Sequence, residues 1–181
     1  MDYVATVLEI VKYTLPSLIV LASSYLIVKN FLISQNQRKQ IAVFKEGQEI
    51  TLRLKLQAYE RLIVFIERMS MRNLIPRIYD SSMTVRDMQQ SIIINIKAEF
   101  DHNLSQQIYV SKNVWETVKN VKEQELKMVN SLATTLNPDA PARDLHARIL
   151  EVTSQTEELP TDMALKIINE EVKMVLSYGS I

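Results

Sequence analysis

The sequence contains no cysteine, and it has only two glycines and five prolines among its 181 residues. Without cysteine the chain can form neither a disulfide framework nor a thiolate metal site. The two glycines are isolated, which excludes a glycine-rich phosphate-binding loop. Low glycine also argues against a turn-rich β architecture, whereas the abundant Leu, Ile, Lys, Glu and Gln favour helices. The composition therefore predicts an all-α protein.

Histidine is scarce as well, and His102 and His146 lie far apart in the sequence. A metal site needs three or four converging ligands, and neither histidine has neighbours at metal-binding spacing. Ser105 follows His102 by three positions, but no nucleophile-elbow motif accompanies this pair. We therefore expect no enzymatic activity, no catalytic residue, no bound metal and no cofactor.

The net charge is zero, but the charges are unevenly distributed along the chain. Residues 29–78 carry ten basic and four acidic side chains, and residues 79–181 carry ten basic and fifteen acidic ones. Anionic lipid would attract the basic block by roughly 1 kcal/mol per residue near the surface, and pairing with the acidic remainder is a further interpretation. No nucleic-acid-binding motif is present, so we expect no nucleic-acid partner. The pairs Glu157-Glu158 and Glu170-Glu171 are interpreted as solvated helix faces.

An uncharged run of sixteen residues, Tyr13–Val28, lies between Lys12 and Lys29 and is rich in Leu, Ile, Val and Ala. A helix that crosses a bilayer needs roughly 20 apolar residues. Apolar neighbours on both sides supply the remaining length, and the two lysines can reach the headgroups. We predict a transmembrane anchor within residues 1–33. A cleaved signal peptide and a buried core helix are the alternatives.

The charges around this run also predict an orientation. Positive charge stays on the cytoplasmic side of a membrane. Asp2 and Glu9 precede the run, whereas several basic residues follow it. We therefore expect the N-terminus outside and the remaining chain in the cytoplasm. The residues expected to flank the membrane are Lys12, Lys29, Arg38 and Lys39.

After the anchor we predict a polar helical neck over residues 34–50 and a soluble domain of four to five helices over residues 51–181. The first helix of this domain has apolar residues three or four positions apart, and Pro76 is expected to end it. This apolar face is interpreted as docked on the domain's own core, with a coiled-coil dimer contact as the alternative. Its apolar positions are Leu52, Leu56, Tyr59, Ile63 and Ile66.

Further helices are expected over residues 83–107, 111–136, 141–157 and from Pro160 onward. The β-branched run Ile92–Ile94 could form a strand, but helical spacing persists on both sides of it. Asp80–Ser82 is expected to be a loop with the N-cap of the second helix, and Ser111 is expected to cap the third. Residues 108–110 are expected to be either extended or a short connector.

Two regions of this domain are richer in hydrogen-bonding groups than a plain core requires. Buried polar groups need partners, so these side chains predict either a structural network or a site for a partner. The residues are Tyr59, Arg61, His102, Asn103, Gln106 and Gln107.

The stretches KLQAYERLIVFIER (55–68) and EFDHNLSQQIYVS (99–111) resemble an uncharacterised family of small single-pass membrane proteins from the Bacteroidota. The surroundings of Trp115 and the late proline-bounded helices are similar too, so the resemblance covers nearly the whole chain. The family has no assigned activity, and the resemblance therefore implies a bacterial inner-membrane location but no catalytic residue.

The anchor, the helical domain and the missing catalytic equipment together favour a scaffold or accessory subunit. Such a protein would bind a protein partner at the cytoplasmic face of the membrane, and it could form a homo-oligomer. A stalk-like subunit of a membrane complex is the alternative. A ligand sensor or an enzyme is the least favoured hypothesis.

Overall fold

The computed structural model describes residues 2–179, which form six α-helices and one 3-10 helix. The described chain is all-α, as its composition predicts, and its only strand-like pairing is an isolated bridge between Thr84 and Pro141. It divides into two compact units, Met1–Ile50 and Thr51–Ile181, and α1 contributes to both. The elements are α1 Asp2–Met69, α2 Met71–Ile78, α3 Val85–His102, η1 Leu104–Ile108, α4 Lys112–Ala133, α5 Ala142–Gln155 and α6 Pro160–Gly179.

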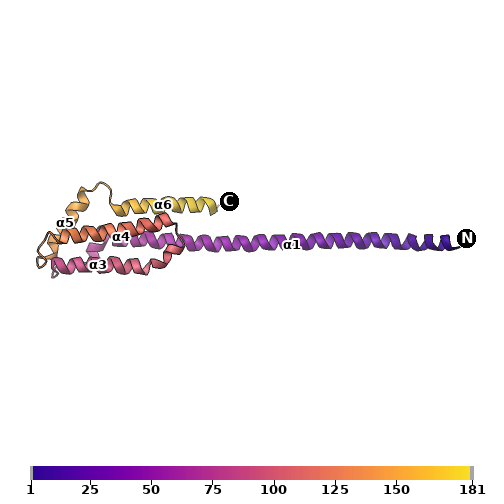
Figure 1. The fold of residues 1–181 in the computed structure, drawn as a ribbon, viewed down its shortest axis with the longest axis horizontal. Coiled ribbons are helices and arrows are strands. Elements are labelled where there is room, and N and C mark those ends of the chain that lie inside the picture. Colours follow the sequence, from indigo (N-terminus) through magenta and orange to yellow (C-terminus); the bar gives the residue numbers. More distant parts are fainter. Residues whose placement is uncertain (1, 180–181) are drawn as a thin grey trace. The chain divides into compact units, whose positions relative to one another are not determined.

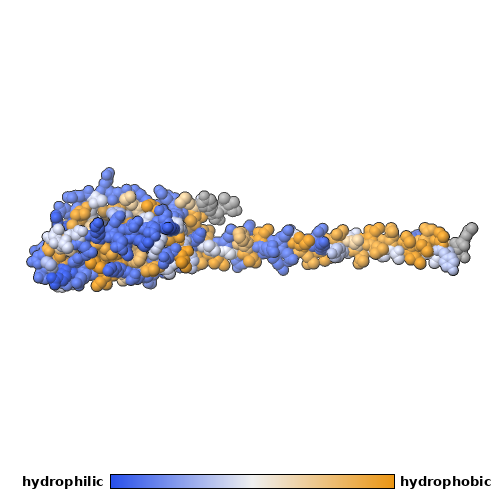
Figure 2. Space-filling view, in the orientation of Figure 1, coloured by the Kyte–Doolittle hydropathy of each residue, from blue (hydrophilic) through white to orange (hydrophobic). Residues whose placement is uncertain are grey.

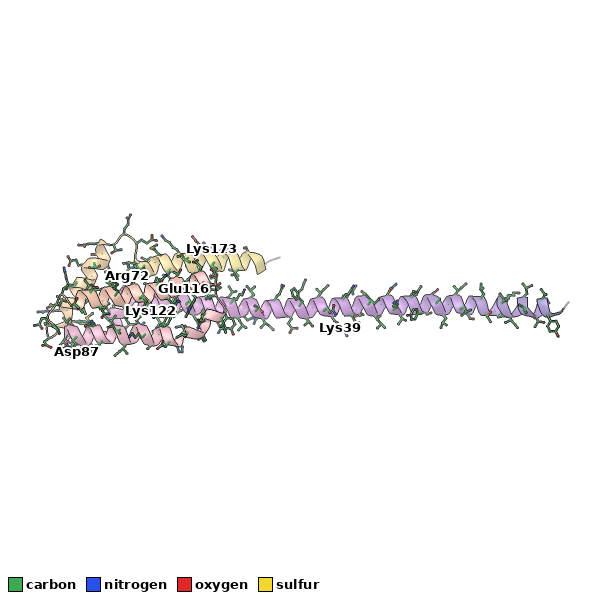
Figure 3. The ribbon with its side chains drawn as sticks, in the orientation of Figure 1. Lys39, Arg72, Asp87, Glu116, Lys122 and Lys173 are labelled. Carbon is green, nitrogen blue, oxygen red and sulfur yellow. The ribbon has the colours of Figure 1, made fainter. Side chains whose placement is uncertain are left out.

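The first unit consists of the N-terminal part of α1. Every residue from Tyr3 to Ile33 is exposed, although many of them are large and apolar. Figure 2 shows these apolar residues along the N-terminal part of the helix, followed by a more hydrophilic stretch that contains Lys39, labelled in Figure 3. By length and composition, α1 could cross a bilayer.

Polar side chains within this apolar stretch bond to their own helix. The hydroxyl groups of Thr14 and Ser23 donate to the carbonyl oxygens of Ile10 and Ile19 at 3.0 and 2.7 Å. Such internal bonds are what a hydrocarbon environment requires, because lipid offers no partner for a hydroxyl group. Pro16 lies inside the helix without ending it.

The second unit is a bundle in which α4 packs against α3, α5 and α6 (Figure 1). The C-terminal part of α1 supplies one side of its core, as the apolar spacing predicts. Tyr59 and Ile66 are buried, and Leu52, Leu56 and Ile63 are half-buried. The largest side chains in this core that are fully buried include Leu62, Phe65, Ile66, Met88, Ile92, Ile96, Leu145 and Ile168.

The first helix of this unit ends earlier than Pro76, so that prediction is wrong. It ends at Met69, and Ser70 has an extended conformation with ψ of 131°. The carbonyl oxygen of Ser70 accepts hydrogen bonds from the backbone of the following turn, and α2 begins there. Pro76 therefore lies inside α2. The break gives the chain a second buried face, made by Met71, Leu74 and Ile75.

The cap of α3 is Thr84 and not a residue of the Asp80–Ser82 turn. The Thr84 hydroxyl accepts from the backbone N–H of Asp87 at 3.2 Å, and the Asp87 carboxylate accepts from the backbone N–H of Thr84 at 3.0 Å. This reciprocal pair is a capping box. Hydrogen bonds from Thr84 lower the pKa of Asp87. Asp87 is labelled at the start of α3 in Figure 3.

The segment between α3 and α4 also differs from the prediction. Ile92–Ile94 is helical, so the strand alternative is wrong, but α3 ends at His102 and the chain continues as η1. Ile108 belongs to η1, and Tyr109 has helical φ and ψ, so residues 108–110 are not extended. Ser111 caps α4 as predicted, accepting from the N–H of Val114 at 3.1 Å.

Candidate functional site

The six polar residues singled out in the sequence do not form one network. Arg61, His102 and Asn103 line one groove of about 280 Å³ between α1 and the end of α3. Tyr59 is buried and takes part in a different cluster, described below. Gln106 is buried and donates to the hydroxyl of its neighbour Ser105 at 3.2 Å, and Gln107 is exposed.

Acidic and basic side chains both line the groove beside Arg61. Arg68 forms an ion pair with Glu99, with 2.7 Å between Nη2 and Oε1. Within residues 2–179, no ion pair of Arg61 or His102 is seen. Both side chains are exposed at the groove and can therefore reach an external acidic group. The remaining lining residues are Gln57, Glu60, Val64, Phe65 and Asn103.

A carboxylate joins three helices at another point of the bundle. Glu171 of α6 accepts hydrogen bonds from the Tyr59 hydroxyl of α1 and from the Ser111 hydroxyl at the start of α4. The backbone N–H of Ser111 donates to the same carboxylate at 3.2 Å. Burial and the hydrogen bond to Glu171 raise the pKa of Tyr59, so this tyrosine remains a donor at neutral pH.

Tyr59 is absent from the groove because it belongs to this cluster. The cluster also corrects the interpretation of Glu170-Glu171 as a solvated helix face. Glu171 is half-buried and hydrogen-bonded, whereas its neighbour Glu170 is exposed. The pair is therefore not a uniformly solvated face. Since Ser111 also caps α4, its hydroxyl ties the start of that helix to α1 and α6 through one carboxylate. We interpret the cluster as structural.

Aromatic rings and a lysine fill the space between the groove and α4. Phe100 packs against Phe65 with 6.0 Å between ring centroids, and against Trp115 with 5.5 Å. The Lys122 ammonium lies 4.1 Å from the centre of the Phe100 ring, within the range of a cation–π interaction. Lys122 also pairs with Glu123 at 2.8 Å. Lys122 therefore has two partners, and neither of them is Glu125 of the same helix.

Glu125 of α4 is a buried acidic residue that the sequence analysis did not single out. Only 5% of Glu125 is exposed, and its Oε2 atom has no hydrogen-bond partner in the described chain. Burial in these surroundings raises the pKa of Glu125 to about 7. A buried carboxyl group without a partner is costly, because desolvation is not offset by hydrogen bonds.

Glu125 lines a partly open cavity of about 400 Å³ between α2, α4, α5 and the segment that leads into α6. Its walls are mainly aliphatic, with Met71, Ile75 and Met128 among them. The sequence signal for this position was available: Glu125 lies four residues after Val121 and four before Val129, on the apolar face of its own helix. A glutamate on the apolar face of a helix indicates a buried carboxyl group.

The sequence was also compared with known proteins. No curated protein and no solved structure matches the chain. The model of one protein family, described as a family of unknown function, matches residues 5–175. This match includes nearly all of both units, the groove and the cavity. The chain therefore belongs to the family of unknown function DUF7935.

Proposed function

We propose that this chain is a single-pass protein of the bacterial inner membrane whose helical unit binds another protein on the cytoplasmic side. One observation carries the proposal: every side chain from Tyr3 to Ile33 is exposed, and many of them are large and apolar. In water such exposure would be unfavourable at about 25 cal/mol per Å² of apolar surface. A bilayer removes that cost.

The orientation rests on the basic residues that follow the apolar run. Lys29, Arg38 and Lys39 would lie on the cytoplasmic side, and Lys12 would reach the opposite headgroups. Lys29 also lies 6.0 Å from the centre of the Tyr25 ring, which suits a lysine and an aromatic residue at a membrane interface. The lipid bilayer is thus the first partner in this proposal.

The absence of native cysteine makes the orientation directly testable. Tyr3→Cys places one thiol before the apolar run, and Gln155→Cys places one on the exposed surface of α5. We expect a membrane-impermeant maleimide to label the first variant in intact spheroplasts and the second only after permeabilisation. Labelling of Gln155→Cys in intact spheroplasts would reverse the proposed orientation.

The partner site in this proposal is the groove beside Arg61. Arg61 and His102 offer donors that form no ion pair among residues 2–179, and Val64, which is 49% exposed, offers an apolar contact. A partner with an acidic side chain next to an apolar one would fit these groups, since arginine binds carboxylates through a planar pair of donors. No catalytic step is assigned to the groove.

Site-specific photocrosslinking in native membranes tests the groove. A benzophenone amino acid at Val64 should give a crosslinked product that disappears when Arg61→Glu is added. The same amino acid at Ile94, which is 63% exposed and outside the groove, provides the control. Equal crosslinking at Ile94 and Val64, or crosslinking that survives Arg61→Glu, would contradict the proposed site.

A stalk-like or homo-oligomeric subunit is the second candidate, and one observation favours it. The neck is helical throughout, and Ile41, Val43, Phe44 and Ile50 are all exposed there. These residues could pack against the same segment of another copy. The benzophenone placed at Phe44 distinguishes the two candidates, because crosslinks between identical chains at this position, without crosslinks at Val64, would favour the stalk.

A further inference from the structure

We propose that the cavity beside Glu125 binds a small organic amine, with the ammonium group paired to the Glu125 carboxylate and an apolar body against the aliphatic walls. This inference does not depend on the proposed partner or orientation, because the whole cavity lies within residues 70–161.

The size and lining of the cavity suit a small molecule. Its volume of about 400 Å³ lies within the range of roughly 300–1,000 Å³ that is usual for ligand pockets. Aliphatic side chains from four segments converge on it, so a bound apolar body would be surrounded on several sides. The aliphatic lining residues include Met71, Ile75, Met128, Ile149, Val152 and Leu159.

Glu125 determines which polar group the ligand must carry. Its Oε2 atom is buried and has no hydrogen-bond partner within the described chain. Lys122, which lies three residues before Glu125 on the same helix, contacts the Phe100 ring and pairs with Glu123. Because Glu125 lines the cavity, its carboxylate would attract a cationic ligand there and repel an anionic one.

Two other titratable residues line the cavity, Arg72 of α2 and His146 of α5. Neither forms an ion pair with Glu125 among the described residues. His146 packs against the Tyr79 ring with 5.9 Å between centroids, and Arg72, labelled in Figure 3, is exposed. If these two residues instead formed the binding group, the preferred ligand would be an anion. The sign of the ligand charge therefore separates the two arrangements.

The methionines provide a direct readout in the full chain. Met71 and Met128 line the cavity, Met88 is fully buried elsewhere, and Met163 and Met174 are exposed. We would record methyl spectra of ¹³C-methionine protein in lipid nanodiscs at about pH 8, where the carboxyl group is largely ionised. The probes are 2-phenylethylamine, its neutral analogue 2-phenylethanol and its anionic analogue phenylacetate.

The expected result is a saturable shift of the Met71 and Met128 signals with the amine. The alcohol should bind at least tenfold more weakly, and phenylacetate should cause no saturable shift. Glu125→Gln should reduce the affinity for the amine about tenfold and bring it close to that of the alcohol. Glu116→Gln, on the same helix but outside the cavity, should leave the affinity unchanged.

Several outcomes would overturn the proposal. The first is the absence of a saturable shift at Met71 and Met128 with all three probes. The second is tighter binding of phenylacetate, and the third is equal binding of the amine by the Glu125→Gln protein. Shifts confined to Met163 and Met174 would indicate binding at the exposed surface of α6 and would also count against it. If Glu125→Gln fails to fold, the comparison of the three probes on the unaltered chain still decides the question.

Leu150 offers a second test that leaves the carboxyl group in place. It lines the cavity but is 61% exposed, so a larger residue there can be accommodated without disturbing the core. Leu150→Trp should partly fill the cavity and weaken amine binding severalfold, with the Met88 signal unchanged. Unaltered affinity in this variant would place the amine elsewhere.

Discussion

Apolar side chains are exposed near the N-terminal end of α1 and mostly buried near its C-terminal end. From Tyr3 to Ile33 apolar residues lie on all sides of the helix and are exposed. From Ala58 to Met69 most of them form one face and are buried in the bundle, whereas Val64 is exposed. An apolar residue therefore does not by itself indicate a protein core. Its distribution around the helix does, because a helix that is apolar all round suits lipid and a single stripe suits a folded domain.

The largest expected difference in stability comes from the same substitution at both ends of α1. Leu62 is fully buried, so Leu62→Ala should lower the free energy of unfolding by about 2–5 kcal/mol through lost burial and the cavity left behind. Leu21→Ala, on an exposed residue, should change it by less than about 0.5 kcal/mol.

Trp115 is the only tryptophan in the chain, and it is largely buried in the second unit. Its fluorescence during denaturant unfolding of the full chain in nanodiscs therefore reports the stability of that unit alone. A similar loss of stability in both alanine variants would contradict the division between the two ends of α1.

A charge in the apolar run should affect membrane association and leave the bundle intact. Leu21→Arg should disfavour insertion by about 2.5–3.5 kcal/mol, because arginine is costly near the centre of a bilayer. Flotation of membranes on a density gradient would measure the fraction retained. Ile41→Arg is the matched control, since Ile41 is also exposed but lies in the neck. Retention of the Leu21→Arg protein equal to that of the control would place the anchor elsewhere.

The buried carboxyl group of Glu125 should make the stability of the second unit depend on pH. Its pKa is about 7 in the folded chain, against an ordinary value of 4.5. The folded state therefore holds a proton that the unfolded state has released between these values, and stability falls as pH rises through this window. The loss should amount to about 1–3 kcal/mol and be complete above roughly pH 8.

Glu125→Gln should remove this pH dependence, because the amide does not titrate. Unfolding followed through Trp115 at a series of pH values would measure it. The variant should gain stability relative to the unaltered chain at high pH and show little difference at low pH. Parallel pH profiles for the two proteins would mean that Glu125 does not titrate in this window.

The smallest expected effect concerns the carboxylate that joins three helices. Tyr59→Phe removes one donor to Glu171, while Ser111 continues to donate. The expected loss is about 1–2 kcal/mol, since a hydrogen bond to a charged group is lost but the carboxylate is not left alone. Tyr79→Phe, at a tyrosine that is 39% exposed, should have almost no effect. Equal effects of the two substitutions would show that the cluster contributes little to stability.

Features that depend on near neighbours along the chain could be predicted from the amino-acid sequence. Apolar spacing identified the all-α class and the buried face that contains Leu62 and Ile66. Ser111 was recognised as a cap because a cap needs only the next turn of backbone. The uncharged run before Lys29 was recognised because its length and composition are local properties too.

Only the tertiary structure decided which distant residues meet. Glu171 lies 112 positions from Tyr59, and nothing in their local sequence indicates that one accepts a hydrogen bond from the other. The same holds for the break at Ser70, which buries Met71, and for the cavity around Glu125. Each of these depends on how helices pack, and packing is set by contacts between residues that are remote in sequence.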